Sequence, residues 1–137
     1  MQKSKFNLKA KKKIYVVGNP LVKADCLPVK LLPQLRKTLP LIEFTEVDPT
    51  ENFIPENDAV IMDAVVGIKR VQWFHSLDDF VATRSASVHD YDLSMHLQLL
   101  LKIKKINRVK ILGIPQFGKE NQILKEVKNI LTESNST

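Results

Sequence analysis

Three polar side chains in this sequence belong to the types that bind divalent metals. Asp25 lies between the apolar run 14–17 and an amphipathic segment, and Asp63 directly follows the apolar run 59–62. His89 lies in a polar stretch before a second amphipathic segment. Two carboxylate oxygens and one imidazole nitrogen can hold a metal and leave positions for water or a substrate carbonyl. The chemistry that this set could perform is metal-assisted hydrolysis.

Each of these residues also has an ordinary structural interpretation. Asp25 could be a surface acid that interacts favourably with the dipole of a following helix. Asp63 could accept hydrogen bonds from neighbouring backbone amides, and His89 could be an exposed loop histidine. The two other histidines, His75 and His96, are expected to be structural.

The elements that would position these residues alternate between strands and helices. Gly18-Asn19-Pro20 is a turn cluster that ends the first strand abruptly. Helical spacing of apolar residues predicts helices over 28–38, from about 93, and over 120–133, while 77–81 is expected to be a connecting turn. Apolar or alternating runs predict strands over 14–17, 41–47, 59–62, 71–75 and 109–114.

This alternation predicts a three-layer α/β sandwich with a largely parallel sheet. In such a sheet the carboxyl ends of the strands face one edge, where loops line a crevice. Asp25, Asp63 and His89 are therefore expected to converge at that edge. Neither GxGxxG nor GxxxxGK[ST] occurs, so a phosphate-binding loop is not expected.

Length and composition predict a single domain. The chain has 137 residues, of which 44% are hydrophobic and 26% charged, as in an ordinary globular domain. No apolar run approaches the roughly 20 residues that cross a bilayer, and the N-terminus lacks the apolar core of a signal peptide. With Cys26 as the single cysteine, we expect a cytoplasmic protein.

The net charge of +6 comes from the N-terminal residues. Residues 1–13 contain six basic residues and no acid, so the rest of the chain is formally neutral. We expect 1–13 to be a flexible, solvated arm and 14–137 to be the single α/β domain. Nucleic-acid binding through the arm is the least favoured function. The six basic residues are Lys3, Lys5, Lys9, Lys11, Lys12 and Lys13.

Four segments carry a family resemblance: GNPLVKAD, VIMDAVVG, SVHDYDLSMHLQLL and VKILGIPQFG. In this order they resemble the motifs of the hydrogenase maturation endopeptidases, over nearly the whole chain after the basic arm. That family trims the C-terminus of the nickel-iron hydrogenase large subunit. The resemblance implies that Asp25, Asp63 and His89 are the metal ligands and catalytic residues, with Gly18 and Asn19 supporting the loop.

The resemblance also implies a twisted five-stranded sheet between helices, a fold of the phosphorylase/hydrolase-like kind. The expected partner is a [NiFe] hydrogenase large-subunit precursor, whose C-terminal extension is removed near nickel already loaded in that precursor. Nickel supplied by the substrate, or another divalent metal, is the expected cofactor. We therefore expect a metal-dependent endopeptidase.

Two positions depart from the family pattern. Many members have two successive acids where this chain has Ala24 and Asp25, and a glycine where it has Pro28. A proline at that place removes an amide donor and fixes φ at the entry to the first helix. The alternative function is thus a catalytically silent homologue that binds metal or peptide.

Overall fold

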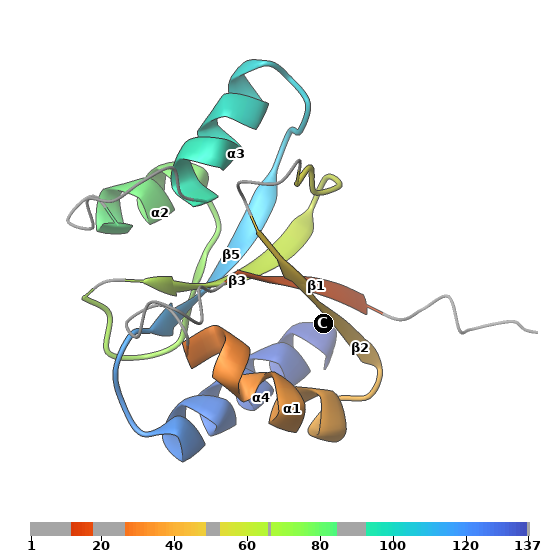
Figure 1. Ribbon diagram of the computed structural model, residues 1–137, viewed down its shortest axis with the longest axis vertical. Coiled ribbons are helices and arrows are strands. Elements are labelled where there is room, and N and C mark those ends of the chain that lie inside the picture. The colour runs from red at the N-terminus through yellow and green to blue at the C-terminus, as the bar shows by residue number, and fades with distance from the viewer. Residues whose placement is uncertain (1–11, 18–26, 49–52, 66, 85–92, 137) are drawn as a thin grey trace, which may run out of the picture.

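The computed structural model describes residues 12–17, 27–48, 53–65, 67–84 and 93–136. Within these ranges, strands and helices alternate along most of the chain (Figure 1). In chain order the elements are β1 (Lys12–Val17), α1 (Leu27–Thr38), β2 (Ile42–Val47), β3 (Ala59–Val65), β4 (Gln72–Phe74), α2 (Leu77–Arg84), α3 (Leu93–Lys102), β5 (Val109–Pro115) and α4 (Glu120–Ser136).

The strands form one five-stranded sheet in the order β2-β1-β3-β5-β4. Neighbouring strands are parallel except for the edge pair β4 and β5, which is antiparallel. From β1 the chain crosses through α1 to β2 on one side, whereas from β3 it proceeds to β5 on the other. The junction of β1 and β3 is therefore a topological switch point, the place where open α/β sheets bind ligands.

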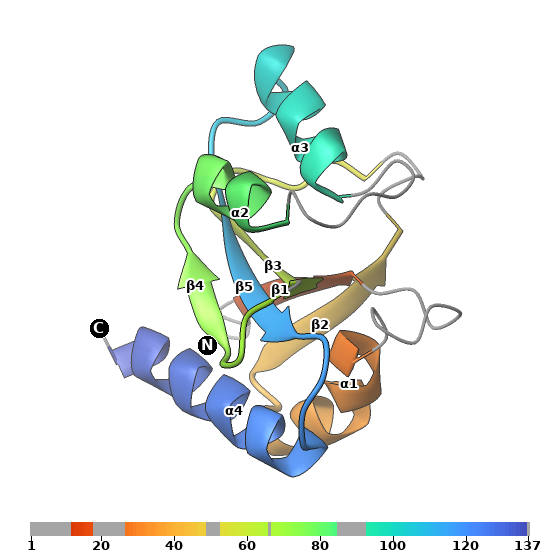
Figure 2. The ribbon, with the colours of Figure 1, turned by 90° about the vertical axis from the view of Figure 1, so that its left-hand side faces the viewer.

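Helices cover both faces of the sheet, which confirms the predicted three-layer α/β sandwich. Figure 2 shows α1 and α4 on one face and α2 and α3 on the other. Each strand contributes alternate side chains to two apolar cores. On β3, for example, Val60 and Met62 pack in the core under α1 and α4, whereas Ala59, Ile61 and Val65 pack in the core under α2 and α3.

Helix α1 tolerates two prolines. Pro28 lies in its first turn, where an amide donor has no helical partner, so the residue fits there. Pro33 lies inside the helix and removes one backbone hydrogen bond. Burial of Leu31, Leu32 and Leu35 against the sheet offsets that loss. The helix is thus maintained by packing on the sheet.

Residues 77–81 were expected to be a turn, and this prediction is wrong, because they belong to helix α2. The Oγ of Ser76 accepts a hydrogen bond of 3.2 Å from the amide of Asp79, as an N-terminal cap does. Phe80 then anchors the helix, since it is fully buried in the core under α2 and α3. A serine followed three residues later by an acid was the available sequence signal.

Several element ends also differ from prediction. Strand β1 begins at Lys12, two residues early, because Lys12 and Lys13 pair with Ile42 and Glu43 of β2. Strand β3 continues to Val65, because its last residues pair with β5 as far as Pro115. At the other end of the chain α4 extends to residue 136.

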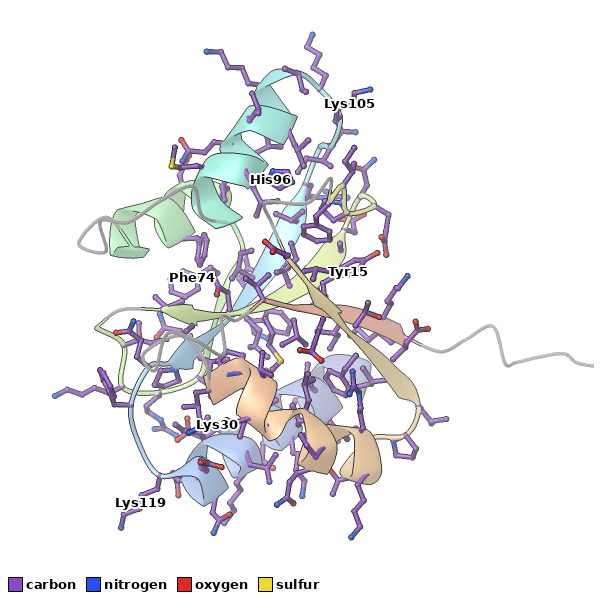
Figure 3. The ribbon with its side chains drawn as sticks, viewed as in Figure 1. Tyr15, Lys30, Phe74, His96, Lys105 and Lys119 are labelled. Carbon is purple, nitrogen blue, oxygen red and sulfur yellow. The ribbon has the colours of Figure 1, made fainter. Side chains whose placement is uncertain are left out.

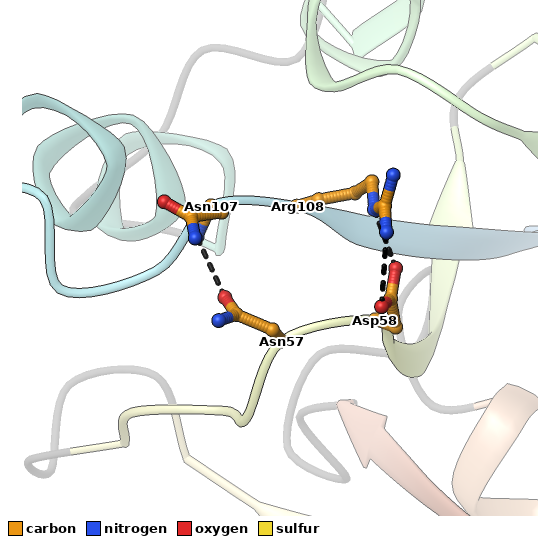
Figure 4. Close-up of polar contacts among 4 residues, drawn as sticks. All are labelled: Asn57, Asp58, Asn107 and Arg108. Atoms are coloured by element: carbon orange, nitrogen blue, oxygen red, sulfur yellow. Dashed lines mark hydrogen bonds and ion pairs between the residues drawn. The ribbon is translucent and has the colours of Figure 1, made fainter.

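The amino ends of β3 and β5 are held together by two side-chain links (Figure 4). The Oδ1 of Asn57 accepts a hydrogen bond of 2.7 Å from the amide of Asn107. The guanidinium of Arg108 binds both carboxylate oxygens of Asp58, at 2.5 and 3.1 Å. The hydrogen bond from Arg108 lowers the pKa of Asp58. These links lie at the opposite end of β3 from Asp63.

Candidate metal site at the carboxyl edge of the sheet

Asp63 lies inside β3, whereas the sequence placed it just past the strand end. Ala64 and Val65 follow it in the strand and pair with Ile114 and Pro115 of β5. The pairing of β3 with β5 is continuous, so side chains alternate strictly along the strand. Asp63 therefore shares a face with Val65 and points toward the layer formed by α2 and α3.

The carboxylate of Asp63 is nearly enclosed, with 4% of the residue exposed. Its Oδ1 accepts a hydrogen bond of 2.8 Å from the amide of Ala64. The paired residues of β3 and β1 end at Met62, so Asp63 lies just beyond this ladder at the switch point. Accepting a hydrogen bond from a neighbouring backbone amide is the structural role that the sequence analysis considered for Asp63. It is also compatible with metal ligation, since an ionised carboxylate has about four acceptor sites.

An apolar surface lies beside Asp63 on the neighbouring strand. The residue opposite Asp63 on β5 is Gly113. A methyl group added at Gly113 would lie 2.6 Å from Cε2 of Phe74 and 3.0 Å from Cγ2 of Val65. The ring of Phe74 thus occupies the space that a larger side chain would fill. With 4% of the residue exposed, a charge at Asp63 has little water around it and depends on its polar partners.

The other predicted site residues, Gly18, Asn19, Asp25 and His89, lie outside the described residues, as does Ala24. In the sequence, Asp25 comes two residues before α1, and His89 comes four residues before α3. The described part of the chain contains no group of three or more histidine, cysteine, aspartate or glutamate residues placed to hold a metal. Convergence of the three predicted ligands stays a prediction.

A buried polar cluster holds α3 on the sheet. A ring nitrogen of His96 is hydrogen-bonded to the carbonyl oxygen of Phe53, and the two rings are stacked with centroids 6.1 Å apart. The ring of Phe53 in turn meets Tyr15 of β1 edge-on, at 5.0 Å. Figure 3 shows Tyr15 and His96 on the same side of the sheet. His96 is therefore structural, as its position in the sequence predicted.

The hydroxyl of Tyr15 and the carboxylate of Glu56 complete this cluster. The hydroxyl of Tyr15 donates a hydrogen bond of 2.6 Å to Oε1 of Glu56. Burial, together with this bond, raises the pKa of Tyr15 to about 12, while the bond lowers the pKa of Glu56. Sequence reasoning missed this pair, because residues 41 positions apart in an ordinary strand and loop carry no local signal.

Comparison with known proteins supports the fold and goes no further. No protein-family model matches the chain, and no curated protein matches its sequence. The chain is similar to a solved structure described as the crystal structure of an uncharacterized protein from Wolinella succinogenes. The two share 16% identity with a TM-score of 0.56, over 92% of this chain and 97% of the other. At this identity the likeness shows a common fold alone.

None of the described helices is both long enough and apolar enough to cross a membrane.

Proposed function

We propose that this chain is a metal-dependent endopeptidase that removes the C-terminal extension of a [NiFe] hydrogenase large-subunit precursor. The observation that carries the proposal is Asp63, a carboxylate 4% exposed on a core strand at the switch point of the sheet. Such a position is costly unless the charge has partners, and functional sites of α/β sheets lie at this edge. The specific activity is proposed from the order of the four sequence motifs, which resembles that of the hydrogenase maturation endopeptidases.

In this proposal Asp25, Asp63 and His89 hold nickel presented by the precursor, or another divalent metal. A metal held there supplies polarisation of the scissile carbonyl. The described residues make two contributions of their own. The amide of Ala64 orients the carboxylate of Asp63, and the ring of Phe74 fills the space over Gly113, the residue opposite Asp63. Gly18 and Asn19 support the loop that precedes Asp25. We place the reaction in the cytoplasm.

The topology supports a role for the other two ligands. Asp25 belongs to the connection that follows β1, and β1 is the neighbour of β3 at the switch point. His89 belongs to the connection that precedes α3, and α3 covers the face to which Asp63 points. The first connection therefore starts at the strand beside β3, and the second leads into a helix that covers the face of Asp63.

Substitution of Asp63 tests the proposal. Asp63→Ala and Asp63→Asn are incubated with a nickel-loaded large-subunit precursor, and the loss of the C-terminal extension is followed by mass spectrometry. We expect cleavage to fall at least about a hundredfold in both variants. Asp78→Asn, which changes an exposed acid on α2, is the matched control and should cleave normally. Unchanged cleavage by Asp63→Ala would refute the assignment.

Ala24 supports a second candidate, the catalytically silent homologue, because many members of the family have an acid at that place. This candidate predicts that the wild-type protein binds nickel or precursor and leaves the peptide bond intact. The same incubation separates the two candidates, since only the endopeptidase releases the C-terminal extension.

A further inference from the structure

Helix α3 exposes a row of apolar side chains on the side away from the sheet. Met95, Leu99 and Ile103 are 50%, 48% and 52% exposed. They are four residues apart, and the amide of Ile103 bonds to the carbonyl of Leu99 at 3.0 Å, so the helical turn continues through Ile103. We call these three residues the outer stripe. The inner face of the same helix buries Leu97 and Leu100, so α3 is apolar on both faces.

An apolar row on the outside of a helix is unusual in a helix with only one covered face. A surface helix normally carries polar residues opposite its core-facing stripe. The outer stripe spans nine residues, or about 12 Å of helix, which is enough to contact two turns of a second helix. Its three members form a continuous row, unlike the isolated exposed Leu41 at the other end of the molecule.

Exposed lysines surround the carboxyl end of the outer stripe. Lys102, Lys104 and Lys105 are all exposed, and the segment from Met95 to Lys105 contains no acidic residue. We call these three lysines the basic collar. Figure 3 shows Lys105 at the end of the molecule that carries α3. The nearby Arg108 is not part of the collar, because it is paired with Asp58.

We propose that the outer stripe and the basic collar dock an acidic amphipathic helix of a partner protein. The apolar side of that helix would cover Met95, Leu99 and Ile103, in the manner of an amphipathic helix bound through residues at i, i+4 and i+8. Its glutamates or aspartates would face the basic collar, where complementary charge speeds association and selects the partner. This inference does not depend on the proposed peptidase activity.

Two other occupants are disfavoured by the observations. A second copy of the chain would bring no acidic residue from 93–105 to face the basic collar, and the nearest acids before α3 are Asp90 and Asp92. A membrane surface would favour aromatic anchors beside the aliphatic residues, and residues 93–105 contain no Phe, Tyr or Trp. Both occupants are outcomes of the experiment below.

The test is a titration of the full chain with synthetic helical peptides, followed by fluorescence anisotropy. The first peptide carries leucines at i, i+4 and i+8 and glutamates on its flanks. The second has the same composition in scrambled order, and the third replaces each glutamate with lysine. We expect the first peptide to bind and the other two to bind at least about tenfold more weakly.

Matched variants locate the binding surface. Leu99→Gln combined with Ile103→Gln should weaken binding of the first peptide at least about tenfold, whereas Leu41→Gln should not. Lys102→Glu combined with Lys105→Glu should weaken it and reduce its dependence on salt, whereas Lys37→Glu, on the exposed side of α1, should not. Circular dichroism of each variant confirms that α3 remains folded.

Three results would overturn the inference. They are equal binding of the scrambled peptide, absence of binding by the first peptide, and binding that the Leu99 and Ile103 substitutions leave unchanged. If the first peptide fails to bind, a dimer in sedimentation, or binding to anionic phospholipid vesicles, that the same substitutions abolish would show that another occupant covers the outer stripe.

Discussion

Asp63 lies in surroundings where an uncompensated charge would be costly. Apolar residues precede it on β3, Gly113 lies opposite, and the ring of Phe74 fills the space over Gly113. The hydrogen bond from Ala64 offsets part of the cost of burying a carboxylate. Asparagine at position 63 keeps an oxygen that can accept this bond and has nearly the same volume. Asp63→Asn therefore tests the charge of the site with little change to the packing.

The pKa of Tyr15 is a direct test of the cluster beneath α3. In a Tyr91→Phe background, Tyr15 is the single tyrosine, so its ionisation can be followed by ultraviolet absorbance. We expect it to titrate at about 12 in this background. In Glu56→Gln the pKa should fall but stay above the ordinary value, because burial is the largest cause of the shift and remains. An unchanged pKa in Glu56→Gln would contradict the described hydrogen bond.

The raised pKa of Tyr15 also predicts a pH dependence of stability. The folded state keeps the phenol protonated to a higher pH than the unfolded state does. This contribution is fully present below pH 10, the ordinary pKa, and is lost as the pH rises toward 12. The free energy of unfolding should therefore decline over this range, and Tyr15→Phe should decline less. Urea unfolding at several pH values measures both.

Gly113 is required by the close approach of β4 to β5. The methyl group of Gly113→Ala would lie within 2.6 Å of the Phe74 ring, so the ring must shift and the core repack. We expect a loss of about 1–3 kcal/mol in the free energy of unfolding. Combining Gly113→Ala with Phe74→Leu should cost less than the sum of the two single changes, because the smaller side chain relieves the clash. If the free-energy costs of the two single changes simply add in urea unfolding, the clash with Phe74 is not what destabilises Gly113→Ala.

At the scale of elements, α4 is tied to the segment that leads into β4. The Oε1 of Glu126 accepts a hydrogen bond of 2.9 Å from the amide of Val71, and Oε2 accepts one of 3.1 Å from Gln122. Arg70 lies 3.7 Å from the same carboxylate but is largely exposed, so its ion pair contributes little. The bond to Val71 is the largest cause that lowers the pKa of Glu126.

This link predicts the effect of acid on stability. Because the pKa of Glu126 is lower in the folded state, its contribution is present above the ordinary pKa and is lost as the pH falls through the folded value. Glu126→Ala leaves the amide of Val71 without its acceptor and should cost about 1–2 kcal/mol near neutral pH. The difference from wild type should shrink below the folded pKa. A difference that is constant from neutral to acid pH would contradict this role.

At the scale of the whole molecule, periodicity predicted the layers and could not predict the links between them. The apolar runs at 59–62 and 109–114 lie in the buried strands β3 and β5, and the spacing of leucines after Pro28 identified α1. The reversal of β4 and the order β2-β1-β3-β5-β4 depend on contacts distant in sequence, for which local patterns carry no information. The hydrogen bond between Tyr15 and Glu56 was hidden for the same reason.

The candidate site was predictable only in part. Asp63 stood out because a carboxylate next to four apolar residues needs a partner, and the structure does bury it. Its place inside the strand was not evident, because the pairing of Ala64 and Val65 with β5 extends β3 beyond the apolar run. Asp25 and His89 were selected by motif order, which no described contact tests.

The geometry of a bound ion shows whether the three proposed ligands lie together. Crystals of the wild-type chain loaded with zinc, recorded at the zinc absorption edge, locate the metal and its ligands. We expect one ion at the carboxyl edge of the sheet, with an oxygen of Asp25, an oxygen of Asp63 and a nitrogen of His89 each about 2.0–2.2 Å away. An ion bound elsewhere, or these three side chains on different sides of the sheet, would refute the proposed metal site.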